Sequence, residues 1–418
     1  MLFSSLFAKT AEYEKLAHAL SAPGACALFG LPGSGRAMVY AALAKETGRF
    51  LCIVTPGEAE ATRFAGDLNA LGIPTAVFPA RDYVLRPIEG TAREYEYRRL
   101  SVLGDIVGGR LQAVCVPDEG LTQYTTPRAE FCNNTRTLHP GDTVPRTELT
   151  ALLYNAGYAR RAQVDGPGQF SIRGDIVDLY APDMKLPVRM EFWGDEIDTM
   201  HTFDLATQRR EDPIEKIYVS PAREVLFGSP AEAAELLRAF IKKFRGKKRT
   251  ALEACLATEL AQLDGGALPV NMDKYLAVRY PQPATLLDYF DDPLLVLEEP
   301  ASLREAERAT TYRRGEEISA LLQDGVLAAG LDNLYAENDY LWAQAANHRT
   351  ICAENFARSM PDIPLKDIVN APAHTLPAWG GEVTSLLEDL QPLCNGGAAV
   401  TVLAGTQRAA AGLAADLR

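Results

Sequence analysis

Apolar and polar residues alternate through two adjoining segments in the middle of the chain, residues 168–182 and 188–203. A period of two is typical of half-buried β-strands, and the glycine-containing turns at 174–175 and 194–196 fit paired strands. The sequence therefore predicts an antiparallel sheet of two hairpins within residues 157–208, with one apolar and one polar face. Its expected core residues are Tyr158, Phe170, Ile172, Ile176 and Phe192.

The segments on either side of this sheet alternate between short apolar runs and stretches of helical periodicity. The predicted strands are residues 26–29, 50–54, 76–78, 111–116 and 294–297. The predicted helices include residues 38–46, 58–71, 93–107, 230–244, 249–263 and 305–322. This alternation is typical of a parallel sheet covered by helices. The predicted fold class is thus α/β, with an inserted antiparallel β-rich domain.

These patterns divide the chain into four regions. Residues 1–127 are expected to form the first half of the parallel-sheet domain, residues 128–213 the inserted domain, and residues 214–346 the second half. Residues 347–418 are expected to begin a further α/β domain, with a strand at 399–403 and a last helix from Gln407. Because that last repeat is cut short, we expect the chain to be a piece of a longer protein.

A glycine-rich loop follows the first predicted strand and precedes a predicted helix, which is the context of a phosphate-binding P-loop. Its residues are Gly30, Gly33, Ser34, Gly35, Arg36 and Ala37. A working P-loop needs a lysine and a Mg²⁺-binding hydroxyl where this chain has Arg36 and Ala37. We therefore expect a degenerate nucleotide loop that is retained for the fold, although its backbone amides could still bind an anion.

Four arginines lie on or beside the predicted sheet: Arg160, Arg161, Arg173 and Arg189. Guanidinium groups on a rigid hairpin are suited to binding carboxylates of an acidic partner. No pair of residues here has the spacing expected of acid-base catalysis.

The composition is that of a globular protein, and the formal net charge of −13 argues against a surface built mainly for nucleic acid. The densest basic run, residues 242–249, is read as a solvated helix end stopped by Gly246, with a DNA contact as the less favoured interpretation.

The seven cysteines have no metal-ligand spacing and are expected to be free, buried thiols. With no signal peptide or membrane-spanning run, we expect a cytoplasmic protein without a bound metal.

Several blocks of the central segment carry a resemblance to a known family. These are Gly157-Tyr158, Arg160, residues 168–178, residues 191–197 and residues 203–209. In order and spacing they resemble the interaction domain shared by the excision-repair helicase UvrB and the bacterial transcription-repair coupling factors. A long tyrosine-rich hairpin that UvrB carries is missing between residues 79 and 93, which favours the coupling factors. Residues 298–301 stand where the helicase relatives have an Asp-Glu-x-His motif, so Glu298 and Glu299 are interpreted as a degenerate Walker B site.

The resemblance implies a non-catalytic, UvrB-like module that recruits UvrA through Arg160 and Arg173, with Arg161 and Arg189 as weaker candidates. In the family, ATP and Mg²⁺ serve other, motor domains, which also contact RNA polymerase and DNA, and a C-terminal domain covers the UvrA site. Two alternatives remain open. One is a divergent P-loop ATPase or UvrB-type subunit, and the other is a DNA-binding module acting through residues 242–249.

Overall fold

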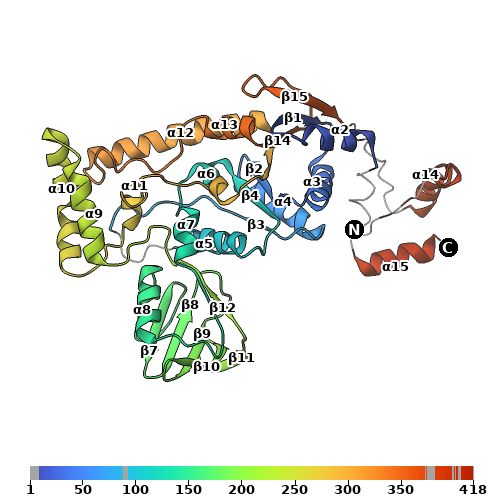
Figure 1. Cartoon of the computed structure of the whole chain (residues 1–418). Helices are drawn as coiled ribbons and strands as arrows, with labels where there is room; N and C mark the ends of the chain where they lie inside the picture. Colours follow the sequence, from blue (N-terminus) through green and yellow to red (C-terminus); the bar gives the residue numbers. More distant parts are fainter. Residues whose placement is uncertain are drawn as a thin grey trace. The chain divides into compact units, whose positions relative to one another are not determined.

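The structure is a computed structural model that describes residues 9–87, 93–371, 373, 382–397, 400, 402 and 406–417. The chain divides into two compact units, residues 1–371 and 372–418. Unit 1 contains a parallel-sheet domain, an inserted β-domain and a helical subdomain, whose elements are labelled in Figure 1.

Seven parallel strands form the central sheet of unit 1, in the order β15-β1-β14-β13-β2-β4-β3. The strands are β1 (Gly24–Phe29), β2 (Leu51–Thr55), β3 (Thr75–Val77), β4 (Ala113–Pro117), β13 (Leu294–Glu298), β14 (Arg349–Glu354) and β15 (Leu365–Asn370). They come from both sides of the inserted domain in sequence, so the predicted α/β class is confirmed.

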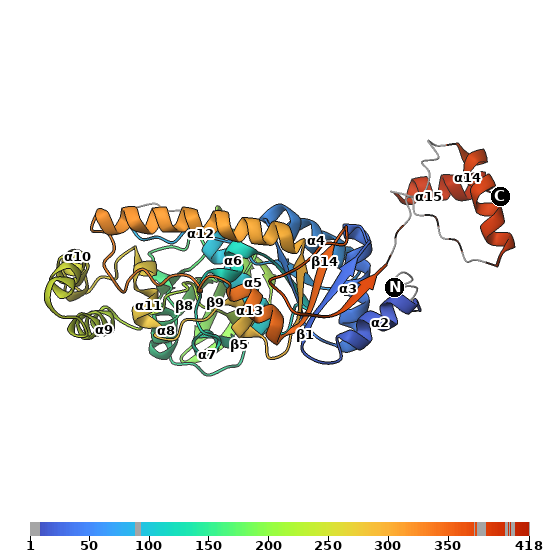
Figure 2. The same cartoon turned by 90° about the horizontal axis from the view of Figure 1, so that it is seen from above.

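Helices cover both faces of this sheet (Figures 1 and 2). On one face lie α2 (Ala11–Ala19), α3 (Gly33–Thr47) and α4 (Glu58–Ala70). On the other lie α5 (Glu94–Val107), α6 (Asp118–Thr122), α7 (Arg128–Asn133), α12 (Pro300–Gln323) and α13 (Tyr340–Asn347). Successive residues of a strand point to opposite faces of the sheet. Because helices cover both faces here, both sets of side chains are buried, and strands such as β13 are continuous apolar runs.

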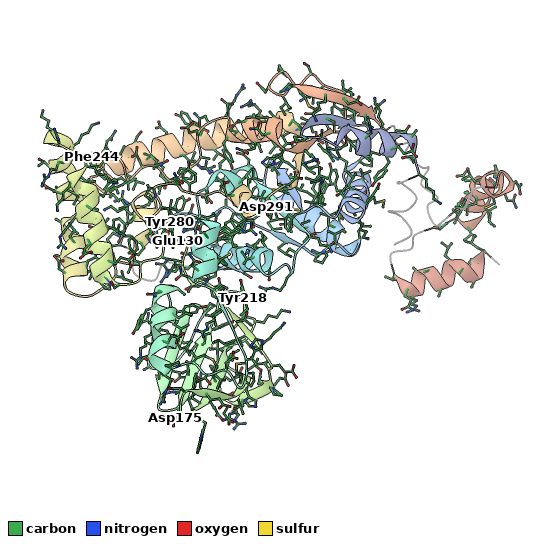
Figure 3. The ribbon with its side chains drawn as sticks, viewed as in Figure 1. Glu130, Asp175, Tyr218, Phe244, Tyr280 and Asp291 are labelled. Atoms are coloured by element: carbon green, nitrogen blue, oxygen red, sulfur yellow. The ribbon has the colours of Figure 1, made fainter. Side chains whose placement is uncertain are left out.

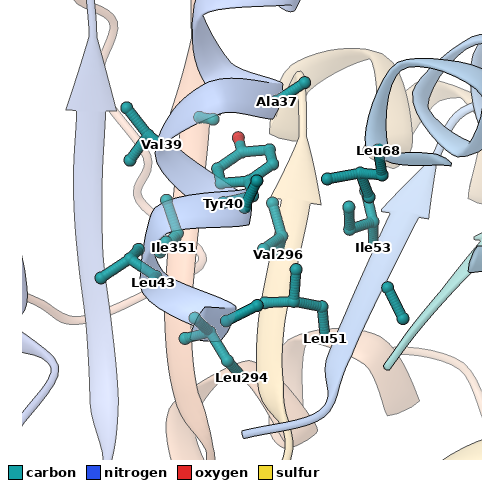
Figure 4. Close-up of a cluster of buried hydrophobic side chains, with 14 of the residues drawn as sticks. Ala37, Val39, Tyr40, Leu43, Leu51, Ile53, Leu68, Leu294, Val296 and Ile351 are labelled. Atoms are coloured by element: carbon teal, nitrogen blue, oxygen red, sulfur yellow. The ribbon is translucent and has the colours of Figure 1, made fainter. Parts of the chain in front are cut away.

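The core beneath α3 shows how this packing is achieved (Figure 4). Tyr40 and Leu43 of α3 pack on alternate residues of the strands, among them Ile53, Val296 and Ile351. All five side chains are fully buried. This core holds the start of α3, and with it the glycine-rich loop, against the ends of β13 and β14.

The inserted β-domain has a six-stranded sheet in the order β11-β10-β9-β8-β7-β6. Its strands are β6 (Ala159–Arg160), β7 (Gln169–Arg173), β8 (Ile176–Tyr180), β9 (Val188–Trp193), β10 (Glu196–Phe203) and β11 (Arg210–Pro213). The two predicted hairpins are β7–β8 and β9–β10, and only the short β6 runs parallel to its neighbour. A helix, α8 (Arg146–Asn155), packs on the inner face.

The predicted position of Ile176 in the core of this sheet is wrong. Because the β7–β8 turn has two residues, Ile176 pairs with Arg173 and shares its face, while Val177 pairs with Ile172 toward the core. Ile176 is accordingly half-buried on the outer face, whereas Tyr158, Phe170 and Phe192 are buried as predicted.

The inserted domain extends further along the chain than residues 128–213. A two-stranded sheet joins β5 (Arg136–Leu138) to β12 (Ile217–Val219), and both strands contribute buried residues to the core of the β-domain. This pairing links sequence before and after the six-stranded sheet, so the boundary lies beyond β12.

A helical subdomain follows, formed by α9 (Pro230–Lys242), α10 (Gly246–Asp264), η1 (Met272–Tyr275) and α11 (Leu276–Arg279), which pack on the end of α12. A short η2 (Leu286–Tyr289) leads back to the central sheet. Gly246 begins α10 and does not stop a helix, so the basic run spans the turn between two helices. That part of the sequence-based interpretation is corrected.

Buried ion pairs join the three parts of unit 1. Arg99 of α5 donates to Glu224 at 2.6 Å, and Arg81 donates to Asp273 of η1 at 2.7 Å. All four side chains are at most 3% exposed. Removing one partner of such a pair leaves an uncompensated buried charge, so this network fixes the junction between the sheet, the β-domain and the helical subdomain.

The unit boundary differs from the predicted boundary at residue 347. The strands β14 and β15 complete the central sheet on either side of β1, and unit 2 begins only at residue 372. Within unit 2 the described residues include α14 (Val383–Asn395) and α15 (Gln407–Asp416). The strand predicted at 399–403 lies largely outside the described residues.

All seven cysteines are free, as predicted, but not all are buried. Cys132 and Cys394 are exposed and Cys255 is half-buried, because these three lie on helices outside the central sheet. Among the described residues, no helix combines the length and apolar character needed to cross a bilayer.

Candidate functional site

The glycine-rich segment lies where the sequence predicts it, between a strand and a helix. It connects β1 to α3, and Gly30 has a φ of +90°. A Cβ atom at Gly30 would lie 2.8 Å from the carbonyl oxygen of Ala371, so a larger residue does not fit. The predicted strand and helix are therefore present, but the predicted loop is shorter. Helix α3 begins at Gly33, so Gly33, Ser34, Gly35, Arg36 and Ala37 lie in the helix and only residues 30–32 form the loop.

The side chain at the P-loop lysine position does not point to a free phosphate site. Arg36 is 3% exposed and forms ion pairs at 2.9 Å with both Glu298 and Glu299, which follow one another at the end of β13. Its guanidinium also donates to the carbonyl oxygen of Ala353 at 3.2 Å. The Tyr40 hydroxyl donates to Glu298 at 2.6 Å, which closes the cluster.

The residues of this loop do not fit a Mg²⁺-nucleotide. Ala37 is fully buried and carries no hydroxyl, and Arg36 is engaged with the carboxylates of Glu298 and Glu299. Burial raises the pKa of Glu298 to about 7, although Arg36 opposes this shift. Glu299 has a φ of +51°, an unusual backbone conformation for a residue with a side chain. The ion pairs of Arg36 with Glu298 and Glu299 thus join the start of α3 to the end of β13.

The outer face of the β-domain sheet is the second candidate site. By register, its central row runs from Ser171 on β7 through Asp178 on β8 and Arg189 on β9 to His201 on β10. The next row toward the hairpin turns contains Arg173, Ile176, Glu191 and Thr199. Trp193, at the end of β9 on the same face, is 83% exposed. The face thus presents polar groups with an exposed aromatic ring at one end.

The carboxylate of Asp178 forms ion pairs with two arginines of this face, Arg173 and Arg189. This carboxylate is fully buried and accepts from Arg189 at 2.6 and 2.9 Å and from Arg173 at 2.6 Å. The hydrogen bonds to Asp178 raise the pKa of Arg189, whose side chain is only 12% exposed and also covers the ring of Phe203. Arg173 is 46% exposed, so it is fixed at one edge of its guanidinium while the rest faces solvent.

The four predicted arginines are not gathered at one point. Arg160 on the edge strand β6 pairs in register with the core residue Phe170. Its side chain therefore belongs to the opposite face of the sheet from that of Arg173. Arg161 lines a separate groove of about 1150 Å³ beside Tyr154 and Phe227. Arg160 and Arg161 are both exposed.

Sequence reasoning missed two residues of the outer face. Asp178 could be assigned only from the register, because its burial depends on β7 and β9 on either side. The signal for Trp193 was present in the sequence, since Arg189, Glu191 and Trp193 share one phase of the alternation in β9. A large aromatic residue in the polar phase of a strand is expected to be exposed.

The comparisons with known proteins bear on this domain. Residues 137–225 match the family model described as "UvrB interaction domain". The match begins with β5 and ends beyond β12, so it agrees with the extent of the domain in the structure.

Curated relatives match most of the chain. The transcription-repair-coupling factor of Bacillus subtilis (strain 168) is 26% identical over 87% of this chain and 32% of its own length. The corresponding factor of Staphylococcus aureus (strain MRSA252) is 24% identical over 90% of this chain and 33% of its own length. The chain resembles the N-terminal region of a bacterial transcription-repair coupling factor. It spans about a third of the length of these relatives.

As a coupling-factor-like region, the chain combines an internally paired Arg36 at the start of α3 with a partly exposed β-domain face. The ion pairs of Arg36 favour a structural role for the loop. The outer face of the β-domain has partly exposed polar and aromatic side chains on a rigid sheet, which are features of a binding surface.

Proposed function

We propose that this chain is a non-catalytic, UvrB-mimicking module that recruits UvrA in transcription-coupled nucleotide-excision repair. The observation that carries the proposal is the outer face of the UvrB interaction domain, where Asp178 holds Arg173 at the surface on β7 and Trp193 is exposed on β9. An ordered arginine loses little entropy when it binds a carboxylate, and an aromatic ring adds apolar contact area. Arg173 is the arginine we expect to contact UvrA.

We propose that a full-length cytoplasmic parent would supply the remaining activities. These are ATP-driven translocation on DNA with Mg²⁺, displacement of stalled RNA polymerase, and a C-terminal domain that covers the UvrA-binding face. The proposal that this chain itself has no ATPase activity is supported by the Arg36 cluster. A titration with a fluorescent ATP analogue and Mg²⁺ should therefore show no saturable binding, and saturation would favour the alternative of a divergent ATPase.

Calorimetric titration of the chain with purified UvrA tests the recruitment proposal. Arg173→Gln should weaken binding by about tenfold or more, or ~1.4 kcal/mol, because an interfacial charge contact is lost. Glutamine is preferable to glutamate at this position, because a new carboxylate would stand beside buried Asp178. Arg160→Gln tests separately whether the sheet edge contributes.

Arg209→Gln is the matched control. Arg209 is an exposed arginine of the same domain, between β10 and β11, at the opposite edge of the sheet from β6. Its substitution should leave the affinity unchanged. An Arg173→Gln protein that folds normally and binds UvrA as tightly as the wild type would contradict the assignment of the outer face.

A further inference from the structure

The turn between α9 and α10 gathers positive charge from two helices. Residues 242–249 contain six cationic side chains and no acidic one, in a chain whose formal net charge is −13. All six are exposed: Lys242, Lys243, Arg245, Lys247, Lys248 and Arg249. A single helix end would spread such residues around its axis, whereas the turn brings the last residues of α9 and the first of α10 to one place.

Most of these cations have no carboxylate partner among the described residues, although the Nζ atom of Lys243 lies 6.0 Å from the ring centroid of Phe240. Arg249 forms an ion pair with Glu253 at 2.8 Å, but the other five cations form no ion pair with the described residues. Elsewhere in unit 1, by contrast, exposed arginines such as Arg86, Arg110 and Arg313 are paired with carboxylates. Five unpaired cations in eight residues repel one another, so an anionic partner would relieve a local electrostatic cost.

The turn is also held in place. Phe244 stacks edge-on against Phe240 at a centroid distance of 5.1 Å, and both rings lie against Gly330, where a Cβ atom would come within 2.8 Å of Phe244. The first turn of α10 has no side-chain cap at Arg245, so its backbone N–H groups remain available to an anion. Cations on an ordered turn beside an uncapped helix N-terminus are favourable for binding phosphate.

We propose that the α9–α10 turn binds the phosphate backbone of duplex DNA without sequence preference. Duplex DNA presents about one negative charge per ~1.7 Å of its axis, so several phosphates can contact one cationic turn. Lysines contribute point charges that contact phosphates, whereas base recognition uses side chains inserted into a groove. The contact would position the module on DNA.

This site is independent of the UvrA proposal. Phe244 marks the turn in the helical subdomain, and Asp175 marks the β7–β8 turn in the β-domain, so the two surfaces belong to different parts of unit 1 (Figure 3). Loss of one binding activity should therefore leave the other intact, and the two proposals can fail separately.

The test measures fluorescence anisotropy of a labelled 20-base-pair duplex of mixed sequence with three proteins at 50 and 200 mM salt. The turn variant changes the five unpaired cations to glutamine: K242Q, K243Q, R245Q, K247Q and K248Q. The control variant changes five exposed, unpaired cations scattered elsewhere among the described residues: K9Q, K185Q, K216Q, R308Q and R358Q. Both variants alter the net charge equally, and thermal unfolding checks that each is folded.

The wild type and the control should bind the duplex at 50 mM salt, and the turn variant should lose at least tenfold in affinity. Between 50 and 200 mM salt the wild-type affinity should fall about 40- to 500-fold, as expected if three to five phosphates are neutralised. Absence of salt-dependent binding, or an equal loss in the control variant, would overturn the proposal. Equally tight binding of poly-glutamate would also overturn it, by showing a site for acidic protein.

Discussion

Replacing Arg36 with methionine tests whether the start of α3 is held against the end of β13 by its buried ion pairs. Methionine keeps much of the side-chain volume but removes the guanidinium between Glu298 and Glu299. Glu298 is 2% exposed, and among the described residues it would retain the side-chain hydrogen bond from Tyr40 alone. Leaving one member of a buried pair without its partner typically costs about 3–5 kcal/mol.

The cost should depend on pH because Glu298 can escape it by taking up a proton. Burial raises the pKa of Glu298 to about 7 from an ordinary value of 4.5, so the folded state holds this proton to higher pH than the unfolded state. The contribution of Glu298 to stability therefore falls as pH rises from about 4.5 through 7. Without Arg36 the pKa of Glu298 should rise further, so the difference between variant and wild type should grow above pH 7.

We expect R36M to lower the free energy of unfolding by about 1–2 kcal/mol at pH 6, from lost hydrogen bonds, and by about 3–5 kcal/mol at pH 8.5. Urea unfolding gives the global value. Hydrogen exchange of peptides from α3 and β13 shows whether the change is local to the cluster.

The matched control is the double variant R36M/E298Q, which removes the charge that Arg36 compensates. Its stability should be closer to that of the wild type at pH 8.5, and its difference from the wild type should no longer increase with pH. An R36M protein that loses the same free energy at pH 6 and pH 8.5 would refute the role assigned to the Arg36–Glu298 pair.

Two further predictions concern the β-domain and the cysteines. Asp178→Asn should destabilise the protein by about 2–4 kcal/mol because two arginines lose their buried carboxylate. Arg173→Gln should cost less than about 1 kcal/mol because Asp178 keeps its ion pair with Arg189. Equal losses in thermal unfolding would contradict the larger role assigned to the buried Asp178–Arg189 pair. A maleimide should label the exposed thiols of Cys132 and Cys394 first. Burial raises the thiol pKa values of Cys26 and Cys52 to about 12, so these two should react only after unfolding in urea. Rapid labelling of either buried thiol in the folded protein would contradict the packing of the central sheet.

Much of the fold follows from local periodicity. The apolar run at β13 and the alternation in β9 and β10 fix the type of each strand, and the glycine turns fix the hairpins. The position of β14 and β15 beside β1 could not be predicted in this way, because strand order depends on contacts between residues far apart in the sequence. The predicted boundary at residue 347 differed for that reason.

The candidate sites show the same division. The unusual residues at Arg36, Ala37, Glu298 and Glu299 can be read from the sequence, but the ion pairs between them depend on β1 and β13 ending at the same edge of the sheet. On the β-domain, the number of residues in one turn decides which face Ile176 occupies. A local pattern therefore gives the residues of a site, and the topology gives their partners.

The measurement that tests the central claim most directly is competition between this chain and UvrB for UvrA. Labelled UvrB bound to UvrA is titrated with the unlabelled chain, and then with the Arg173→Gln and Arg209→Gln variants. If the outer face of the β-domain mimics UvrB, the wild type and the Arg209 variant should displace UvrB, and the Arg173 variant should require about tenfold more protein. Simultaneous binding of the chain and UvrB to UvrA, with no displacement at saturation, would contradict the account.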